Sequence, residues 1–368
     1  MSQTSGCSGT MTSNGDVTCT ITNSDIPTGN GAITVIKDVV NDNGGELSTE
    51  DFTLNIISEE EGSIEAPSGQ ANFLTPGNYS VSEGELPGGY LQTSINCTNG
   101  DTETTDGSVV LGEQDAWTCT ITNDDQPGTL HVIKNLIQDN GGIKIVSDFQ
   151  FSLDDGETWT SFEEDGQNDV SVNAGIYSVI EQEVNGYTTT YEDNEEGDCS
   201  EMEVGNGGEA TCTITNNDES AHLTIVKYTD EESGDGEFGF NVTGLEGSIN
   251  LETDGGSASS ESIDLDAGSY DVTESVPEGW NLSSVSCEYD DDDDIGSSIE
   301  NGEQITVGNG NDVTCTFTNT KRGVINGIKY EDKNGDGNQD EAESGLEGWT
   351  IYLDTNDNGS LDEGETSV

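Results

Sequence analysis

The hexapeptide TCTITN occupies Thr18–Asn23, Thr118–Asn123 and Thr211–Asn216, and it returns as TCTFTN at Thr314–Asn319. The cysteines of successive copies lie 100, 93 and 103 residues apart. A period of this length corresponds to a whole domain and is too long for a solenoid repeat. Each copy alternates with period two and is rich in β-branched residues, which predicts a half-buried strand. The chain is therefore expected to contain tandem copies of one strand-rich domain.

Two further phrases recur in step with this hexapeptide. One is a Val- and Ile-rich segment with the copies AITVIK, LHVIK and LTIVK. The other has the copies YSVSE, YSVIE and YDVTE, each followed by an aromatic residue after a glycine. All of them alternate with period two, and turn signals such as NDNGG and PGG separate them. We predict an all-β fold in which each repeat is an immunoglobulin-like β-sandwich of about seven short strands.

The same phrases divide the chain into domains. Only the end of a repeat precedes the first complete one, and the last stretch follows a different pattern, so we expect a fragment of a longer protein. The expected domains are a C-terminal remnant of a repeat at 1–26, three repeats at 27–126, 127–219 and 220–321, and a truncated calcium-binding domain at 322–368.

Composition excludes several classes of partner. The 368 residues include 76 Asp and Glu against 8 Lys and Arg, for a formal net charge of -68. Such a surface repels phosphate backbones and anionic lipids, so we expect no nucleic-acid partner. No apolar run approaches the roughly 18 residues of a membrane helix, so we expect no membrane insertion in this sequence. Cations are the natural small partners.

Eight cysteines occur two per repeat, and the second of each pair belongs to the hexapeptide. We predict one disulfide per repeat, each contributing about 3 kcal/mol. Stable disulfides imply an oxidising, extracellular location. The alternative is four pairs of reduced, buried thiols in a cytoplasmic protein. The pairs are Cys7 and Cys19, Cys97 and Cys119, Cys199 and Cys212, and Cys287 and Cys315.

Strand parity directs three polar residues of every repeat toward the apolar face. Side chains alternate between the two faces of a strand, so residues two apart share a face. By this count the lysine of the first phrase, the glutamate of Y-x-V-x-E and the asparagine of the hexapeptide all point inward. The three sets are Lys37, Glu83 and Asn123; Lys134, Glu181 and Asn216; and Lys227, Glu274 and Asn319.

Such a set has a definite chemistry. Burial lowers the pKa of a lysine and raises that of a glutamate, which leaves a neutral amine beside a protonated acid. The amine can then attack the side-chain carbonyl of the asparagine while the acid shuttles protons and ammonia leaves. The product is a Lys–Asn isopeptide bond between the first and last strands. The alternative is that the lysine snorkels from a strand end and the asparagine begins a turn.

The order of these motifs resembles that of CnaB-type, prealbumin-like domains of bacterial and archaeal surface proteins. The resemblance covers residues 27 to about 320 and rests on the strand-ending lysine, on Y-x-V-x-E followed by G-Y, and on T-x-T-N. It implies that the lysine supplies the amine, the asparagine the acyl group and the glutamate the proton shuttle of an intramolecular isopeptide bond.

The C-terminal stretch contains two candidate calcium loops, DKNGDGNQDEAE from Asp332 and DTNDNGSLDEGE from Asp354. The first fits the pattern D-x-[DN]-x-[DN]-G-x5-E, whose alternating oxygen ligands and central glycine suit calcium. The alternative is a pair of solvated acidic turns. The predicted ligands are Asp332, Asn334, Asp336, Asn338, Asp340 and Glu343 in the first loop and Asp354, Asn356, Asn358, Asp362 and Glu365 in the second.

No amphipathic helix flanks these loops, which argues against a calmodulin-like sensor. The stretch from Gly323 to Glu365 resembles the calcium-binding B domain of serine-aspartate-repeat surface adhesins, another prealbumin-like sandwich. The resemblance implies calcium as the cofactor.

No signature of a turnover site is found, so we expect no enzymatic activity and no catalytic residues beyond the self-reacting sets. His131 and His222 occupy matching outward strand positions without a second ligand. The NDNGG and QDNGG segments lack a closing acid, which favours plain turns over calcium turns.

The expected function is that of a secreted or cell-surface structural or adhesive protein. In it, a stalk of repeats is locked by disulfides and isopeptide bonds and carries a calcium-stabilised module. Expected partners are calcium ions and host or matrix surface macromolecules. An alternative is a calcium-stabilised accessory region of a large extracellular enzyme. A third is an intracellular calcium buffer, which oxidised cysteines would exclude.

Overall fold

The computed structural model describes residues 26–60, 62–193, 197–230, 234–290, 297–298 and 301–368. Within these ranges the chain forms β-strands and two short 3-10 helices, η1 (Thr49–Asp51) and η2 (Val146–Asp148), without an α-helix. The all-β prediction is therefore confirmed. No helix of the described residues is long and apolar enough to cross a membrane.

The chain divides into two compact units. The first comprises the described residues up to Leu223 together with Asp264–Ser269 and Thr306–Asp312. The second comprises the described residues of Thr224–Ile263, Tyr270–Ile305 and Val313–Val368.

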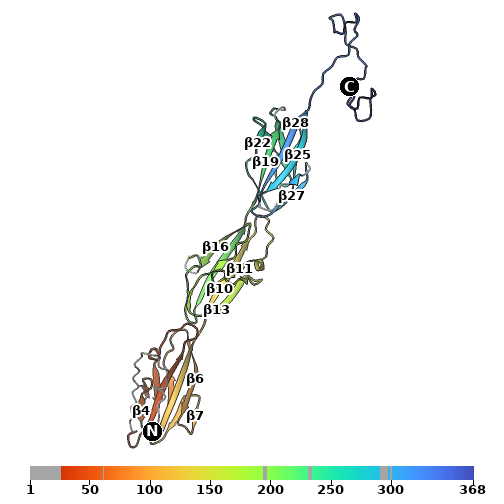
Figure 1. Cartoon of the computed structure of the whole chain (residues 1–368). Coiled ribbons are helices and arrows are strands. Elements are labelled where there is room, and N and C mark those ends of the chain that lie inside the picture. Colours follow the sequence, from red (N-terminus) through yellow and green to blue (C-terminus); the bar gives the residue numbers. More distant parts are fainter. Residues whose placement is uncertain (1–25, 61, 194–196, 231–233, 291–296, 299–300) are drawn as a thin grey trace, which may run out of the picture. The chain divides into compact units, whose positions relative to one another are not determined.

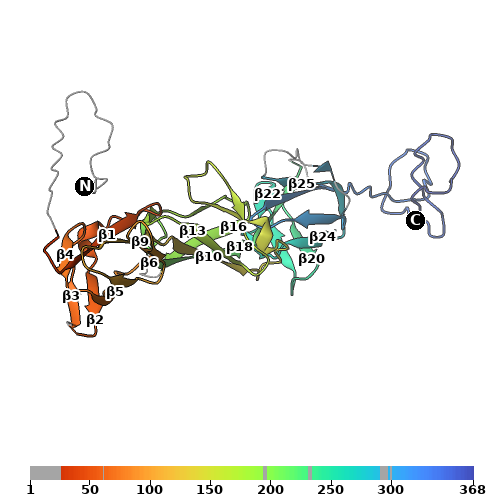
Figure 2. The same cartoon turned by 90° about the horizontal axis from the view of Figure 1, so that it is seen from below.

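The first repeat is a sandwich of two sheets (Figure 2). One sheet has the strand order β4-β1-β9-β6-β7 and the other β3-β2-β5-β8. The strands are β1 (Gly31–Val40), β2 (Leu54–Ser58), β3 (Gly62–Glu65), β4 (Ala71–Leu74), β5 (Gly77–Glu83), β6 (Tyr90–Thr98), β7 (Glu103–Thr104), β8 (Ser108–Leu111) and β9 (Ala116–Asp125).

The first strand and the last strand of this repeat lie side by side. β1 and β9 pair in parallel, with Lys37 opposite Ile121 and Val39 opposite Asn123. Alternate residues of both strands enter the core, where Ile33, Val35 and Ile121 are completely buried. Period-two alternation of β-branched residues therefore produces the buried face that it predicts.

The second repeat follows the same plan. Its main sheet, in which Figure 1 labels β10, β13 and β16 and Figure 2 also β18, has the order β13-β10-β18-β16. The first strand, β10, again pairs in parallel with the last, β18. The opposing layer consists of β12-β11-β15 and β14-β17. The strands are β10 (Gly128–Ile137), β11 (Gln150–Ser152), β12 (Thr160–Ser161), β13 (Gln167–Val172), β14 (Gly175–Tyr177), β15 (Ile180–Glu181), β16 (Tyr187–Asp193), β17 (Met202–Val204) and β18 (Glu209–Asp218).

The third repeat has the sheets β22-β19-β28-β25-β26, in which β23 also pairs with β19, and β21-β20-β24-β27. The strands are β19 (Ala221–Thr229), β20 (Glu237–Val242), β21 (Ile249–Glu252), β22 (Ser257–Ser259), β23 (Ile263–Leu265), β24 (Gly268–Ser275), β25 (Trp280–Tyr289), β26 (Ser297–Ser298), β27 (Gln304–Val307) and β28 (Asp312–Lys321).

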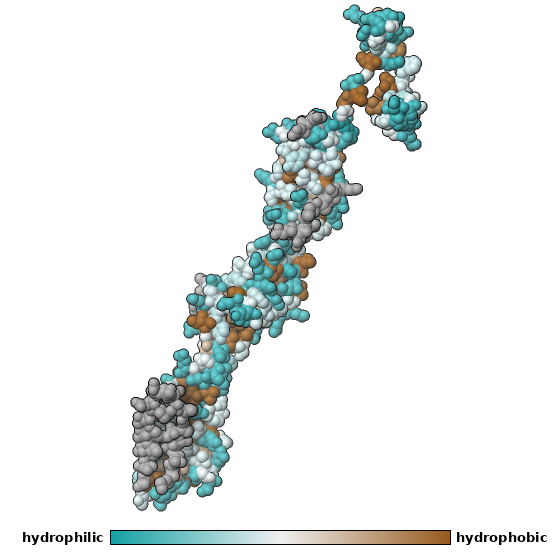
Figure 3. Space-filling model, viewed as in Figure 1, coloured by the Kyte–Doolittle hydropathy of each residue, from teal (hydrophilic) through white to brown (hydrophobic). Residues whose placement is uncertain are grey.

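The C-terminal segment, residues 322–368, has a different character. It contains isolated bridges, Tyr330 to Gly345 and Tyr352 to Ser367, in place of named strands. Hydrophobic side chains lie open on it (Figure 3), and Val324 and Ile325 are 80% and 76% exposed. This segment is therefore not built around a buried core like those of the repeats.

Candidate cross-linking sites and calcium loops

Each repeat buries the lysine, glutamate and asparagine that strand parity directs inward. The lysine comes from the first strand and the asparagine from the last strand of one sheet, while the glutamate comes from the opposing layer. All three asparagines are completely buried, and the most exposed lysine, Lys134, is 6% exposed. The glutamate side chains are at most 4% exposed. The three residue types thus meet at one place in every sandwich.

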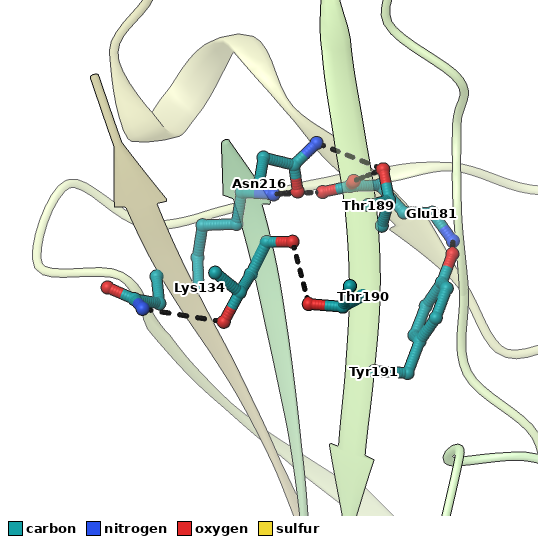
Figure 4. Close-up of polar contacts among 8 residues, drawn as sticks. Lys134, Glu181, Thr189, Thr190, Tyr191 and Asn216 are labelled. Atoms are coloured by element: carbon teal, nitrogen blue, oxygen red, sulfur yellow. Dashed lines mark hydrogen bonds and ion pairs between the residues drawn. The ribbon is translucent and has the colours of Figure 1, made fainter. Parts of the chain in front are cut away.

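The second repeat brings its three residues into direct contact (Figure 4). The Lys134 amine contacts both Glu181 Oε1 and Asn216 Oδ1. The hydroxyl of Thr189, on β16, orients the other two side chains. It donates to Glu181 Oε2 over 3.2 Å and accepts a hydrogen bond from Asn216 Nδ2 over 3.1 Å. The three residues that are predicted to act as nucleophile, acyl group and proton shuttle therefore lie within one hydrogen-bonded cluster.

An aromatic ring covers the lysine in each repeat, a feature that the sequence analysis does not identify. The amines of Lys37, Lys134 and Lys227 lie 4.5, 4.0 and 4.4 Å from the ring centroids of one phenylalanine each. The same ring packs edge-on against the aromatic residue that follows the glycine after Y-x-V-x-E. The pairs are Phe52 with Tyr90, Phe149 with Tyr187, and Phe238 with Trp280. The signal available in the sequence is a phenylalanine after an acidic residue in EDF, SDF and GEF.

These surroundings shift the proton equilibria toward the reactive forms. Burial lowers the pKa of Lys37 and of Lys134, although the neighbouring glutamate acts in the opposite direction. Burial lowers the pKa of Lys227 to about 8 and raises that of Glu274. In the third repeat, both shifts favour a neutral amine beside a protonated carboxyl group.

The first repeat holds its three residues less tightly. The Lys37 amine lies 3.2 Å from Glu83 Oε1 and donates to the backbone carbonyl of Ile121 over 3.2 Å. Neither the oxygen nor the nitrogen of the Asn123 amide has a hydrogen-bond partner in the part of the chain that the structure describes. A buried amide without partners is costly, on the order of 1–3 kcal/mol.

The third repeat shows another arrangement. The Lys227 amine donates to the carbonyl of Phe317 over 3.1 Å and lies 3.7 Å from Glu274 Oε2. The amide nitrogen of Asn319 donates to Glu274 Oε1, and its oxygen has no partner among the described residues. The glutamate therefore stands between the amine and the amide.

Three of the four predicted disulfides form. They join Cys97 to Cys119, Cys199 to Cys212 and Cys287 to Cys315. In the first and third repeats the two cysteines face each other on neighbouring antiparallel strands. The predicted pair of Cys7 and Cys19 lies outside the described residues.

The two candidate calcium loops fold alike. Asp332 accepts backbone hydrogen bonds from Gly335, Asp336 and Gly337. Asp354 accepts equivalent bonds from Asn358 and Gly359. Both central glycines have positive φ angles, 81° for Gly337 and 75° for Gly359, as the sharp turn of such a loop requires.

The side chains at predicted ligand positions touch one another. In the first loop the Asn334 amide donates to Asp336 and to Asp340 over 3.1 and 2.7 Å. The closing residue, Glu343, is 5% exposed and accepts backbone hydrogen bonds from Lys333 and Asp340.

The second loop repeats this pattern. Asp362 accepts hydrogen bonds from the amides of Asn356 and Asn358, and Glu365 accepts from the backbone of Thr355 and Asp362. Both sets offer only carboxylate and amide oxygens as ligands, which fits a hard cation such as calcium. In the first loop, the remaining predicted ligand, Asn338, donates its backbone N–H to Asp336.

Outside these sites the titratable residues form smaller groups. His131 pairs with Asp169 over 2.6 Å, and His222 pairs with Asp312 over 2.9 Å, both at the surface. Within the described ranges, one group of three acidic residues has ligand atoms within 4.8 Å of one another, namely Asp42, Asp124 and Asp125. It lies at the NDNGG turn.

Fold and site together define a class of protein that consists of a series of β-sandwiches. Each sandwich buries a lysine from its first strand, an asparagine from its last strand and a glutamate from the opposing layer. Comparison with family models agrees. Residues 29–121 and 125–214 match one model of a prealbumin-like fold domain, and residues 223–321 match a second model with the same description. The chain therefore belongs to the proteins built from tandem prealbumin-like fold domains.

Several solved structures are similar at low identity. The Bacillus anthracis TIE protein is 18% identical, with a TM-score of 0.44, over 80% of this chain and 51% of that one, so this chain spans about half its length. A major pilin from Streptococcus pyogenes is 18% identical, with a TM-score of 0.23, over 53% of this chain and 99% of the pilin.

Two B repeat units of the collagen-binding protein of Staphylococcus aureus are 12% identical, with a TM-score of 0.25, over 80% of this chain and all of those units. No curated protein matches the chain.

Proposed function

We propose that the chain is part of a secreted or cell-surface structural or adhesive protein whose repeats are each locked by a Lys–Asn isopeptide bond. The observation that carries the proposal is the contact of the Lys134 amine with both Glu181 and Asn216 inside a buried, aromatic-covered site. The sets around Lys37 and Lys227 would form the same bond in the other two repeats.

The reaction needs no external reagent. The neutral Lys134 amine attacks the side-chain carbonyl carbon of Asn216 and forms a new C–N bond. Glu181 gives a proton to the amide nitrogen of the asparagine and takes one from the attacking nitrogen. The original C–N bond breaks and ammonia leaves. Each set of residues undergoes this step once and is consumed by it, so the reaction is not enzymatic turnover.

The position of the bond gives it a mechanical role. Lys134 lies in the first strand of its repeat and Asn216 in the last, 82 residues further on. A pull applied at the two ends of the repeat would pass through the cross-link instead of unravelling the sandwich. Closing a loop of this length also stabilises the folded state by about 4–5 kcal/mol in the chain-entropy model.

A location outside the cell is supported by the three disulfides, which persist in oxidising compartments. The pilins and the collagen-binding protein among the similar structures have the same kind of fold. Macromolecules of a host or of an extracellular matrix are the corresponding proposed partners.

Calcium is the proposed cofactor of the C-terminal segment. The ion would be held by the carboxylate and amide oxygens of each loop, with Glu343 and Glu365 closing them, and would supply the positive charge that these crowded acidic side chains lack. Calorimetric titration of the full chain with calcium should give two strong sites. Asp332→Ala should remove one of them, whereas the same change at Asp235, in the third repeat, should remove none. Equal heats for the parent chain and both variants would contradict the proposal.

The cross-links are tested by the intact mass of the full chain after reduction. Three isopeptide bonds would lower the mass by three ammonias, and peptide mapping would recover a branched peptide that contains Lys134 and Asn216. The variant Lys134→Met should lose one ammonia fewer, while Lys144→Met, outside the buried sites, should still lose three. A reduced mass equal to that of the sequence would refute the cross-links.

A further inference from the structure

The turn after the first strand is capped by a buried aspartate from the end of the last strand. In the first repeat the Asp125 carboxylate accepts the backbone N–H groups of Asp42, Asn43 and Gly45 over 2.9, 3.0 and 2.6 Å. Asp125 is completely buried. Burial alone would raise its pKa, but these N–H groups outweigh that effect and lower the pKa.

The second repeat contains an equivalent turn. The Asp218 carboxylate accepts the N–H groups of Asp139, Asn140 and Gly142 over 2.9, 3.0 and 2.7 Å, and its pKa is lowered in the same way against the effect of burial. We call the two segments, Asn41–Gly45 with Asp125 and Gln138–Gly142 with Asp218, the acceptor turns.

Loops of the following repeat bind to each acceptor turn. At the first turn, Asn206 donates its side-chain N–H to the Asn43 carbonyl over 3.2 Å and to Asp125 Oδ2 over 3.1 Å. The backbone N–H of Ala174 donates to the same Asn43 carbonyl over 2.8 Å. The N–H of Gly207 reaches the Gln126 carbonyl over 2.9 Å. We call the two loops that carry Ala174 and Asn206 the donor loops.

The same contacts recur at the second acceptor turn. Asn309 donates to the Asn140 carbonyl over 2.9 Å and to Asp218 Oδ2 over 3.3 Å, and the N–H of Ala267 donates to the Asn140 carbonyl over 2.8 Å. The loops of Ala267 and Asn309 are therefore a second pair of donor loops, and both belong to the compact unit that contains the second acceptor turn. Two independent copies of one hydrogen-bond pattern indicate a built interface.

Glycines make the close approach possible. Gly89 has a φ angle of 78°, and a Cβ atom there would lie 2.3 Å from the Asn206 carbonyl oxygen. Gly44 has a φ angle of 85°, and its Cβ would lie 2.7 Å from the Ala174 carbonyl oxygen. Gly186 and Gly141 have the same role at the second turn. Contact with the next repeat therefore explains why glycine occupies these two positions, Gly89 in the PGG turn and Gly44 in the NDNGG turn.

We propose that acceptor turn and donor loops form a head-to-tail clamp that fixes each repeat to its successor, and that the residues at these positions determine where the clamped series starts and stops. At the donor positions the first repeat has Pro76, which lacks an N–H group, and Glu113 in place of the asparagine. It can accept a successor but cannot donate to a predecessor in this way.

The third repeat has the donor residues but lacks the acceptor residues. It carries both donor residues, Ala267 and Asn309, but Lys321 occupies the position of Asp125 and Asp218, and no NGG sequence follows its first strand. The residues at these positions therefore allow a clamp between the first repeat and the second, whereas the third repeat lacks the acceptor residues for a further one. This inference does not depend on the isopeptide bonds.

The experiment measures the freedom between the first two repeats in the full chain. Spin labels are attached through introduced ketone side chains at the exposed positions Ser63 and Thr160, which leaves the cysteines untouched. The distance distribution should be narrow in the parent chain. Without the clamp, two domains joined by a short linker are expected to move, so Asn206→Ala should widen the distribution by about twofold or more.

Two further variants make the result decisive. Ala174→Pro copies the residue of the first repeat at the matching position and should also widen the distribution, because it removes the N–H donor. Glu113→Ala changes the matching loop of the first repeat and should leave the width unchanged. The Cys199–Cys212 bond, checked by mass, shows that the second repeat of each variant is folded. A distribution that stays narrow in both Asn206→Ala and Ala174→Pro would overturn the clamp.

Discussion

The second and third repeats bury the same three residue types in the same strands, yet they arrange them differently. In the second, the Lys134 amine touches the amide oxygen of Asn216 directly. In the third, the amide nitrogen of Asn319 points at Glu274, while the Lys227 amine donates to a backbone carbonyl. Identical reactive residues therefore do not guarantee an identical reactive geometry.

The residue across the strand pair accounts for the difference. Asn216 lies opposite Thr189, whose hydroxyl accepts a hydrogen bond from the amide nitrogen and so turns the amide oxygen toward the lysine. Asn319 lies opposite Leu282, which has no polar group, and the strand register shifts just beyond it, between Leu282 and Ser284. With no hydroxyl on the opposite residue, the amide nitrogen of Asn319 donates to Glu274.

The largest effect is expected from Lys134→Met, which would prevent the proposed cross-link in the second repeat. The chain-entropy model predicts a loss of about 4–5 kcal/mol for opening a loop of this length. Calorimetry of the full chain should show that the second repeat unfolds at a clearly lower temperature. Hydrogen exchange identifies which unfolding transition belongs to this repeat. Replacing Cys199 and Cys212 by Ser opens a loop of only 13 residues and should cost about 3 kcal/mol in the same model. A larger effect from the cysteine variant would contradict the assigned roles.

An intermediate, pH-dependent effect is expected in the third repeat when its bond cannot form, as in Asn319→Ala. In the unsubstituted chain, burial lowers the pKa of the Lys227 amine to about 8 in the folded state, compared with 10.5 for an ordinary lysine. Between these values the unfolded state binds more protons than the folded state, so the stability of this repeat should rise with pH above about 8. Adding Lys227→Met should remove the rise. A stability that falls over this range would show that the buried amine is charged.

The smallest effect is expected from exchanging the residues opposite the asparagines. Leu282→Thr should give Asn319 the partner that Asn216 has, and Thr189→Leu should remove it from the second repeat. One hydrogen bond of about 1 kcal/mol corresponds to about a fivefold change in the rate of cross-linking. Intact mass of freshly translated chain, followed over time, should show a faster third repeat in the first variant and a slower second repeat in the other. Unchanged rates in both would mean that the opposite residue does not control the reaction.

Sequence patterns were sufficient for the fold and for the buried lysine, glutamate and asparagine of each repeat, but not for other buried polar residues such as Asp125 and Asp218. Period-two alternation directs Lys37, Glu83 and Asn123 to one interior because strand geometry leaves only two faces. The cysteine spacing likewise predicts the pairs, since both members fall within one repeat. For the candidate calcium loops the sequence supplies the predicted ligand types, and the structure adds a similar turn in each loop.

The amino-acid sequence by itself determined that this protein is a series of β-sandwiches with a lysine, a glutamate, an asparagine and a cysteine pair in every complete repeat. These features follow from local periodicity and from repetition, which need no knowledge of the fold. Only the tertiary structure decided which residue lies across from each asparagine, which phenylalanine covers each lysine, and that Asp125 and Asn206 meet. Those contacts depend on strand register and on loops distant in sequence, and no local pattern encodes either of them.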